Sequence, residues 1–199
     1  MSLEFINSLG TVTTVVIVAA TAIAALVQLR HLRAGNQINA MISIGDKFQG
    51  LPFTDALELV NAKLATALDD PTFRSYVVAV NRGPSVPNVD AQYVEVRRAA
   101  VLVGNTYEEL GILVKNGIVD KTLFLDRYCG VTIGAWHRLE NFTAFIREVT
   151  ADSGIWENFE LLTVMSEDFL RESPSTYPRS IRRLQLSNPW PVPPLPATA

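Results

Sequence analysis

A long apolar segment near the start of the chain constrains its fold more than any other feature. No charged side chain occurs between Glu4 and Arg30, and residues 11–29 are mostly Val, Ile, Ala, Leu and Thr. An α-helix rises about 1.5 Å per residue, so about 20 residues cross a hydrocarbon layer of about 30 Å. The segment is therefore long enough to span a membrane as a single helix.

A cleaved export signal and a buried core helix are the alternatives to a retained membrane anchor. Ala-Thr-Ala and Ala-Ile-Ala within the segment resemble cleavage sites, but a signal peptide has a basic start and an apolar stretch of only about 7–15 residues. The opening residues, MSLEFINSLG, contain no Lys or Arg and include Glu4. The sequence therefore favours a retained anchor over residues 1–29.

The charges that flank the apolar segment predict its orientation. Arg30 and Arg33 follow it directly, and no Lys or Arg precedes it. Positive residues stay on the cytoplasmic side of a membrane. We therefore expect an N-terminus outside the cell, a C-terminal body in the cytoplasm, and the inner membrane and its lipid as the surroundings of the anchor.

Small residues recur along the apolar segment at Gly10, Thr14, Thr21 and Ala25. Such residues let two helices approach closely in lipid. They predict a helix-packing face, through which the chain would bind a second copy of itself or another membrane protein. The alternative is that Ala and Thr are merely tolerated in lipid.

The remainder of the chain predicts an all-α fold. We expect a helical stalk over residues 30–52, with its weak point at Gly35–Asn36, and a compact cytoplasmic helical bundle over residues 53–172. Residues 173–199 hold seven of the eleven prolines, so this tail is expected to be extended. No pair of alternating strands separated by a hairpin turn is evident.

Residues that favour helix N-caps mark four expected helix starts, at Thr54, Asp70, Asp120 and Ser153. Pro71 follows Asp70 in the first helical position, where its missing N–H has no consequence. We expect the helix after Asp120 to reach about Leu139 and a separate short helix or turn to follow it.

The clearest helical pattern lies between Asp90 and Asn116. Its apolar side chains recur at alternating spacings of three and four, a heptad pattern: Tyr93, Val96, Ala100, Val103, Tyr107, Leu110 and Val114. Gly117 stands where a residue with a left-handed backbone often ends a helix.

Two glycines, Gly130 and Gly134, lie inside the helix that follows Asp120. Together they cost about 1.5–2 kcal/mol in helix propensity. A close crossing by another helix would offset this cost, and a kink is the competing explanation.

The sequence contains no recognisable nucleotide-binding loop, nucleophile elbow or zincin helix. His137 and Glu140 share a helix face and are weak metal-ligand candidates, because di-iron bundles use Glu-x-x-His pairs and this chain has the reverse order and one other histidine.

The single cysteine, Cys129, has apolar neighbours and is expected to be a buried thiol. A net charge of −3 argues against nucleic-acid binding. We expect no catalytic residue and no cofactor.

Three stretches of the chain are similar to a bacterial family described as domain of unknown function 4760. They are LEFINSLGTVTTVVIVAATAIAALVQLRHLRAGNQ, YEELGILVKNGIVDKTLFLD and IWENFELL. The resemblance extends from Leu3 to about Glu172 and leaves out the proline-rich end. It implies a single-pass anchor with an α-helical cytoplasmic body, and it brings no activity.

These features predict a membrane-anchored, non-enzymatic interaction or scaffold protein that forms oligomers. A sensor or effector that binds a small ligand or metal in its helical core is one alternative. An accessory subunit of a larger membrane complex is another.

Overall fold

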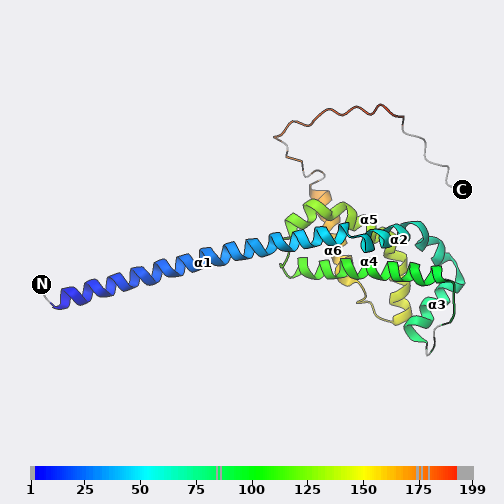
Figure 1. Ribbon diagram of the computed structural model, residues 1–199, viewed down its shortest axis with the longest axis horizontal. Coiled ribbons are helices and arrows are strands. Elements are labelled where there is room, and N and C mark those ends of the chain that lie inside the picture. Colours follow the sequence, from blue (N-terminus) through cyan, green and yellow to red (C-terminus); the bar gives the residue numbers. More distant parts are fainter. Residues whose placement is uncertain are drawn as a thin grey trace.

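The computed structural model describes residues 3–83, 85, 87–173, 175, 177–178 and 180–191, with side chains from residue 10 onward. Its described part contains six α-helices and no strand, which confirms the predicted all-α fold. The helices are α1 (Leu3–Gln49), α2 (Leu51–Asp69), α3 (Pro71–Arg82), α4 (Ala91–Lys115), α5 (Lys121–Thr150) and α6 (Glu157–Glu172). The described residues after α6 form neither helix nor strand and leave the body (Figure 1). Residues 192–199 of the expected tail lie outside the described residues.

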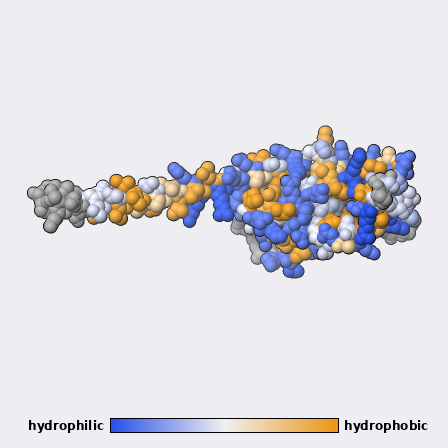
Figure 2. Space-filling view, turned by 90° about the horizontal axis from the view of Figure 1, so that it is seen from below, coloured by the Kyte–Doolittle hydropathy of each residue, from blue (hydrophilic) through white to orange (hydrophobic). Residues whose placement is uncertain are grey.

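The longest helix, α1, projects far from the body formed by the other five (Figure 1). Among the described helices, it alone is long and apolar enough to cross a membrane, and no side chain of its apolar part is buried. Apolar side chains dominate this projecting part, and polar ones appear where α1 approaches the body (Figure 2). The helix is not interrupted at Gly35–Asn36, the weak point expected from the sequence.

The last turns of α1 belong to the core of the body. Ile44 is only 4% exposed. The ring of Phe48 lies 5.0 Å from that of Phe53, 5.3 Å from that of Tyr107 and 5.0 Å from that of Tyr128. These partners come from α2, α4 and α5, so the projecting helix is fixed to three other helices.

Helix α4 lies at the centre of the body, between α2 and α6, with α5 alongside and α3 at the end away from the projecting helix (Figure 1). The predicted heptad residues of α4 are buried from Val96 to Val114, and Tyr93 is half-buried. This seam packs against helices of the same chain.

Two predicted N-caps are confirmed by hydrogen bonds, and Asp90, where the next helical pattern was expected to start, caps α4 in the same way. The carboxylate of Asp70 accepts from the Thr72 N–H at 2.7 Å, and that of Asp120 accepts from the Leu123 N–H at 2.9 Å. Asp90 accepts from the Gln92 N–H at 2.8 Å. Gly117 has a φ of 67°, so the predicted left-handed end of α4 is also confirmed.

Other predicted helix boundaries are wrong. Helix α2 begins at Leu51, with Pro52 in its first turn, and Thr54 lies inside it with its hydroxyl donating to the Gly50 carbonyl at 3.2 Å. Helix α5 does not end near Leu139 but runs unbroken to Thr150. Ser153 caps nothing, because α6 begins after Trp156, whose backbone is left-handed.

Close helix approach occurs on α4, at Gly104 and Gly111. A β-carbon on Gly104 would lie 2.3 Å from the Trp156 ring, and one on Gly111 would lie 2.1 Å from the Asn158 carbonyl oxygen. Among the described residues, no other helix crosses closely at Gly130 or Gly134. A β-carbon on Gly130 would meet nothing within 4 Å, and one on Gly134 would meet only the flexible Arg138 side chain. Packing of these two glycines against a helix of another molecule stays a prediction.

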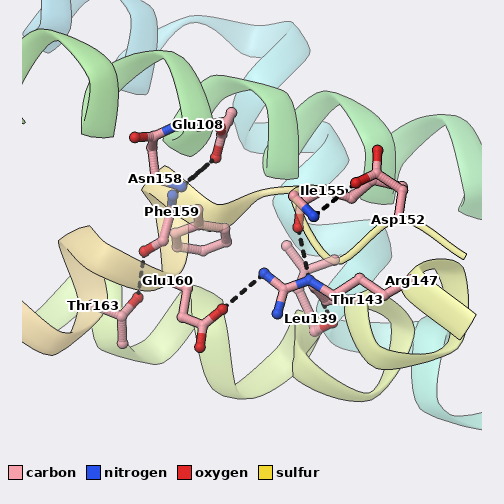
Figure 3. A network of polar contacts seen from close by, with 11 residues as sticks. Glu108, Leu139, Thr143, Arg147, Asp152, Ile155, Asn158, Phe159, Glu160 and Thr163 are labelled. Carbon is pink, nitrogen blue, oxygen red and sulfur yellow. Dashed lines mark hydrogen bonds and ion pairs between the residues drawn. The ribbon is translucent and has the colours of Figure 1, made fainter.

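The start of α6 is capped by Glu108, which reaches across from α4 (Figure 3). Its carboxylate accepts the backbone N–H groups of Asn158 and Phe159, each at 2.9 Å, and the Asn158 side-chain amide at 2.6 Å. The first N–H groups of a helix have no partner within it. A distant acidic residue therefore does what a local cap residue usually does.

The connection between α5 and α6 is held by Arg147. Its Nε donates to the Ile155 carbonyl at 2.9 Å, and its guanidinium pairs with Glu160 at 2.7 Å (Figure 3). The indole N–H of Trp156 donates to Asn105 of α4 at 2.9 Å. These bonds hold the turn against both α4 and α5.

Replacing Gly104 or Gly111 with alanine should destabilise the body, because overpacking of this kind costs about 1–3 kcal/mol of unfolding free energy. Gly130→Ala is the matched control: its β-carbon enters open space, and alanine favours a helix interior by about 1 kcal/mol. Urea unfolding of the full chain in detergent micelles, followed by tryptophan fluorescence, measures all three. Equal stability of Gly111→Ala and Gly130→Ala would contradict the close crossing.

Glu108→Gln should lower the unfolding free energy by about 2 kcal/mol, because hydrogen bonds to a charged group contribute about 1.5–3 kcal/mol. Glu109→Gln is the neighbouring control, since Glu109 is exposed and pairs only with Lys47 at the surface, where such pairs contribute about 0–1 kcal/mol. The same urea titration distinguishes the two. A loss at Glu109 as large as that at Glu108 would refute the capping role.

Candidate functional site

An open groove lies where α1 meets the body, between the second half of α1 and the first turns of α5. Its volume is about 460 Å³. It is lined by Ile38, Met41, Ile42, Gly45, Asp46 and Gln49 of α1 and by Leu123, Asp126 and Arg127 of α5. On both helices the lining residues recur at spacings of three and four, which places them on one helix face each.

The rim of the groove is aliphatic and exposed. Ile38 is 57% exposed, Ile42 is 58% exposed and Leu123 is 51% exposed. Removing apolar surface from water contributes about 25 cal/mol per Å². Covering this rim with another apolar surface would therefore be favourable.

The hydroxyl of Tyr128 lies close to Gly45, a residue that lines the groove. This hydroxyl lies 3.6 Å from the position that a β-carbon on Gly45 would take. It is buried and has no hydrogen-bond partner among the described residues. One polar group beside the groove is therefore left without a hydrogen bond among the described residues.

Charges of both signs line the groove. Asp46 and Asp126 contribute carboxylates, and the Arg127 guanidinium lies 5.3 Å from the centre of the Tyr128 ring. Within the described part of the chain, neither Asp46 nor Arg127 takes part in an ion pair of the body. Such a surface is suited to binding an apolar segment flanked by charge.

The predicted metal-ligand candidates lie on the surface of α5. The Nδ1 atom of His137 is 3.6 Å from a carboxylate oxygen of Glu140, and both side chains are exposed. In the part of the chain that the structure describes, no group of three His, Cys, Asp or Glu side chains is placed to hold a metal ion. The two residues form a surface ion pair when the imidazole is protonated.

The predicted packing face of the apolar segment lies on the projecting part of α1. Gly10, Thr14, Thr21 and Ala25 are all exposed. The Thr14 hydroxyl donates to the Gly10 carbonyl at 2.9 Å, and the Thr21 hydroxyl donates to the Ile17 carbonyl at 2.8 Å. The hydroxyls are therefore satisfied within the helix, and packing against another helix stays a prediction.

Arg30 and Arg33, which the sequence predicts to set the membrane orientation, are exposed on α1 between the apolar segment and the groove. The thiol of Cys129 is free and buried, as the sequence predicts.

Perturbed acid groups occur away from the groove. The hydrogen bond from the Tyr93 hydroxyl, together with that from the Thr72 N–H, lowers the pKa of Asp70, and the same bond raises the pKa of Tyr93. Burial raises the pKa of Tyr107 far above its usual value. Asp70 caps α3, so its perturbation serves helix structure.

Sequence reasoning missed the groove. Ile38, Met41 and Ile42 are apolar residues of the predicted stalk, but their spacing alone does not distinguish the core face of a helix from an exposed one. The body covers Met41 partly and leaves Ile38 and Ile42 uncovered. That distinction depends on which helices pack against α1.

A sequence profile of the family described as domain of unknown function (DUF4760) matches residues 15–165. The chain belongs to this family. The match begins inside the apolar segment and ends within α6, so the DUF4760 region includes most of α1, the groove and the Glu108 cap. No curated protein and no solved structure matches the chain.

Tyr93→Phe should raise the pKa of Asp70 towards its usual value of about 3.9. A carboxyl whose pKa is lowered by folding stabilises the protein above its unfolded pKa, and this contribution is lost as the pH falls through the folded pKa. The variant should therefore lose less unfolding free energy than the parent between about pH 5 and pH 2. Urea titrations across this range test it, with Tyr177→Phe in the tail as control. If the unfolding free energy of Tyr93→Phe fell with pH as steeply as that of the parent, the Tyr93 hydrogen bond would not be what lowers the pKa of Asp70.

Proposed function

We propose that this DUF4760 protein is a single-pass membrane protein whose helical body is a non-enzymatic interaction module. The N-terminus lies outside the cell and the body lies on the cytoplasmic side of the inner membrane. The observation that carries the proposal is the continuity of α1, which begins as an exposed apolar rod and ends in the core of the body.

Exposure of the apolar segment supports the membrane anchor. Its large side chains, such as Val15, Val18 and Leu26, are each about 60% exposed, close to what an isolated helix allows. Residues 10–29 would extend about 30 Å at 1.5 Å per residue, the thickness of a hydrocarbon core. Lipid is a solvent in which this exposure carries no hydrophobic penalty.

The flanking arginines support the orientation. Arg30 and Arg33 follow the segment and no cationic side chain precedes it. Retention of Lys and Arg in the cytoplasm would place the body there.

The groove supports an interaction role. Its exposed aliphatic side chains and its charges of both signs match the mixture of apolar and polar groups found on protein-binding surfaces. The centre of the body is filled by aromatic rings, such as Tyr107 stacked on Phe159 at 4.6 Å. Binding would therefore take place on the outside of the bundle, either in a self-assembly or as an accessory subunit of a larger complex.

Carbonate washing of membranes should leave the full-length protein in the pellet, and its intact mass should include residues 1–29. Orientation is measured with a membrane-impermeant maleimide on intact cells, in a Cys129→Ala background. Ser2→Cys should be labelled from outside, and Ser187→Cys only after permeabilisation. Release by carbonate, a missing N-terminal segment or the reverse labelling would each overturn the proposal.

A further inference from the structure

One face of α1 runs without a charge from the apolar segment to the groove. Its positions follow one another at alternating steps of four and three residues, the spacing that keeps side chains on one seam of a supercoiled helix pair. In the apolar part these positions are Gly10, Thr14, Ile17, Thr21 and Ala24. We call the whole face, from Gly10 to Gln49, the α1 seam.

The α1 seam continues beyond the arginines with the same spacing. After Gln28 and His31 it contains Gly35, Ile38, Ile42, Gly45 and Gln49, and the helix has no break between the two halves. The charged residues of this region, Arg30, Arg33, Asp46 and Lys47, all lie at other positions of the helix.

The body leaves the two isoleucines of the α1 seam exposed and covers Gly45 only in part. Helix α1 packs on the body through Ile44 and Phe48, whereas Ile38 and Ile42 are more than half exposed. At about 100° per residue, Ile44 lies about 120° from Ile38 and about 160° from Ile42 around the helix. The seam therefore faces sideways into the groove, where a second helix would lie against α1 and against Leu123, Asp126 and Arg127 of α5.

We propose that the α1 seam binds the α1 seam of a second copy of this chain, in a parallel pair with two-fold symmetry. The inference rests on the proposed membrane anchor and names its partner. Lipid can cover the first half of the seam and a soluble protein can cover the second. Only a helix that itself passes from lipid into water covers both, and a second copy in the same membrane has the same depth and direction.

Charge complementarity at the groove favours a second copy over another helix. In a two-fold pair, Asp46 of one copy lies beside the groove of the other, which contains Arg127, and the reciprocal contact forms at the same time. Neither group is engaged in an ion pair within the described chain. Close to Gly45 of the seam, the buried Tyr128 hydroxyl has no hydrogen-bond partner among the described residues.

Disulfide cross-linking of the full chain in its native membrane tests the pair. In a Cys129→Ala background, single cysteines replace Ile38 or Ile42 on the seam, or Asn36 or Ser43 off it; all four positions are exposed. After mild oxidation, the seam variants should form covalent dimers about tenfold more than the off-seam variants, because the two β-carbons must approach within about 4.5 Å. Equal cross-linking at all four positions, no dimer at the seam, or a product of another mass would overturn the second-copy pair.

A charge exchange tests the groove contact. Asp46→Arg should reduce dimer formation through the Ile42→Cys cysteine, and adding Arg127→Asp should restore it. A reduction that the second change does not rescue would contradict the reciprocal contact. Carbonate washing of the same membranes separates this result from the anchor itself: protein that stays in the pellet without cross-linking refutes only the pair, whereas protein released by the wash refutes the membrane-anchored function.

Discussion

The close approach of α6 to α4 is the contact on which the rest of the structure depends. Gly104, Glu108 and Gly111 lie on one face of α4; the two glycines admit the Trp156 ring and the Asn158 backbone, and the acid between them caps α6. The cap fixes Phe159, whose ring stacks on Tyr107 at 4.6 Å, and Tyr107 in turn contacts Phe48 of α1. The direction in which α1 leaves the body therefore depends on how α6 begins.

Through these contacts the projecting helix determines where the body is held. Because Ile44 and Phe48 pack on the core and α1 has no break, one continuous helix joins the apolar segment to the body. Flexible stalks let a domain sample many orientations above a membrane, whereas a continuous helix sets both its height and its rotation. Any helix that packs on α1 in lipid thereby positions the two faces of the groove as well.

The parts of the fold that sequence could predict are those with local signals. Asp70, Asp90 and Asp120 cap helices through N–H groups two or three residues away, and the buried positions of α4 follow from spacing alone. The start of α6 had no such signal, because its cap lies about 50 residues earlier in the chain. Likewise, Gly104 and Gly111 are no different in local sequence from Gly130 and Gly134; only the tertiary contact of α6 distinguishes them. The groove was missed for the same reason.

The composition of the α1 seam fits the two solvents through which it would pass. In lipid, aliphatic side chains gain little by leaving one apolar medium for another, so close backbone packing by Gly, Ala and Thr drives association. In water, burial of aliphatic surface contributes more to association than close backbone packing does. Before the arginines the seam has four small residues and one isoleucine, Ile17; after them it has two isoleucines, Ile38 and Ile42, beside Gly35 and Gly45. A seam that only tolerated lipid would have no physical reason to continue in register with exposed isoleucines on the water side.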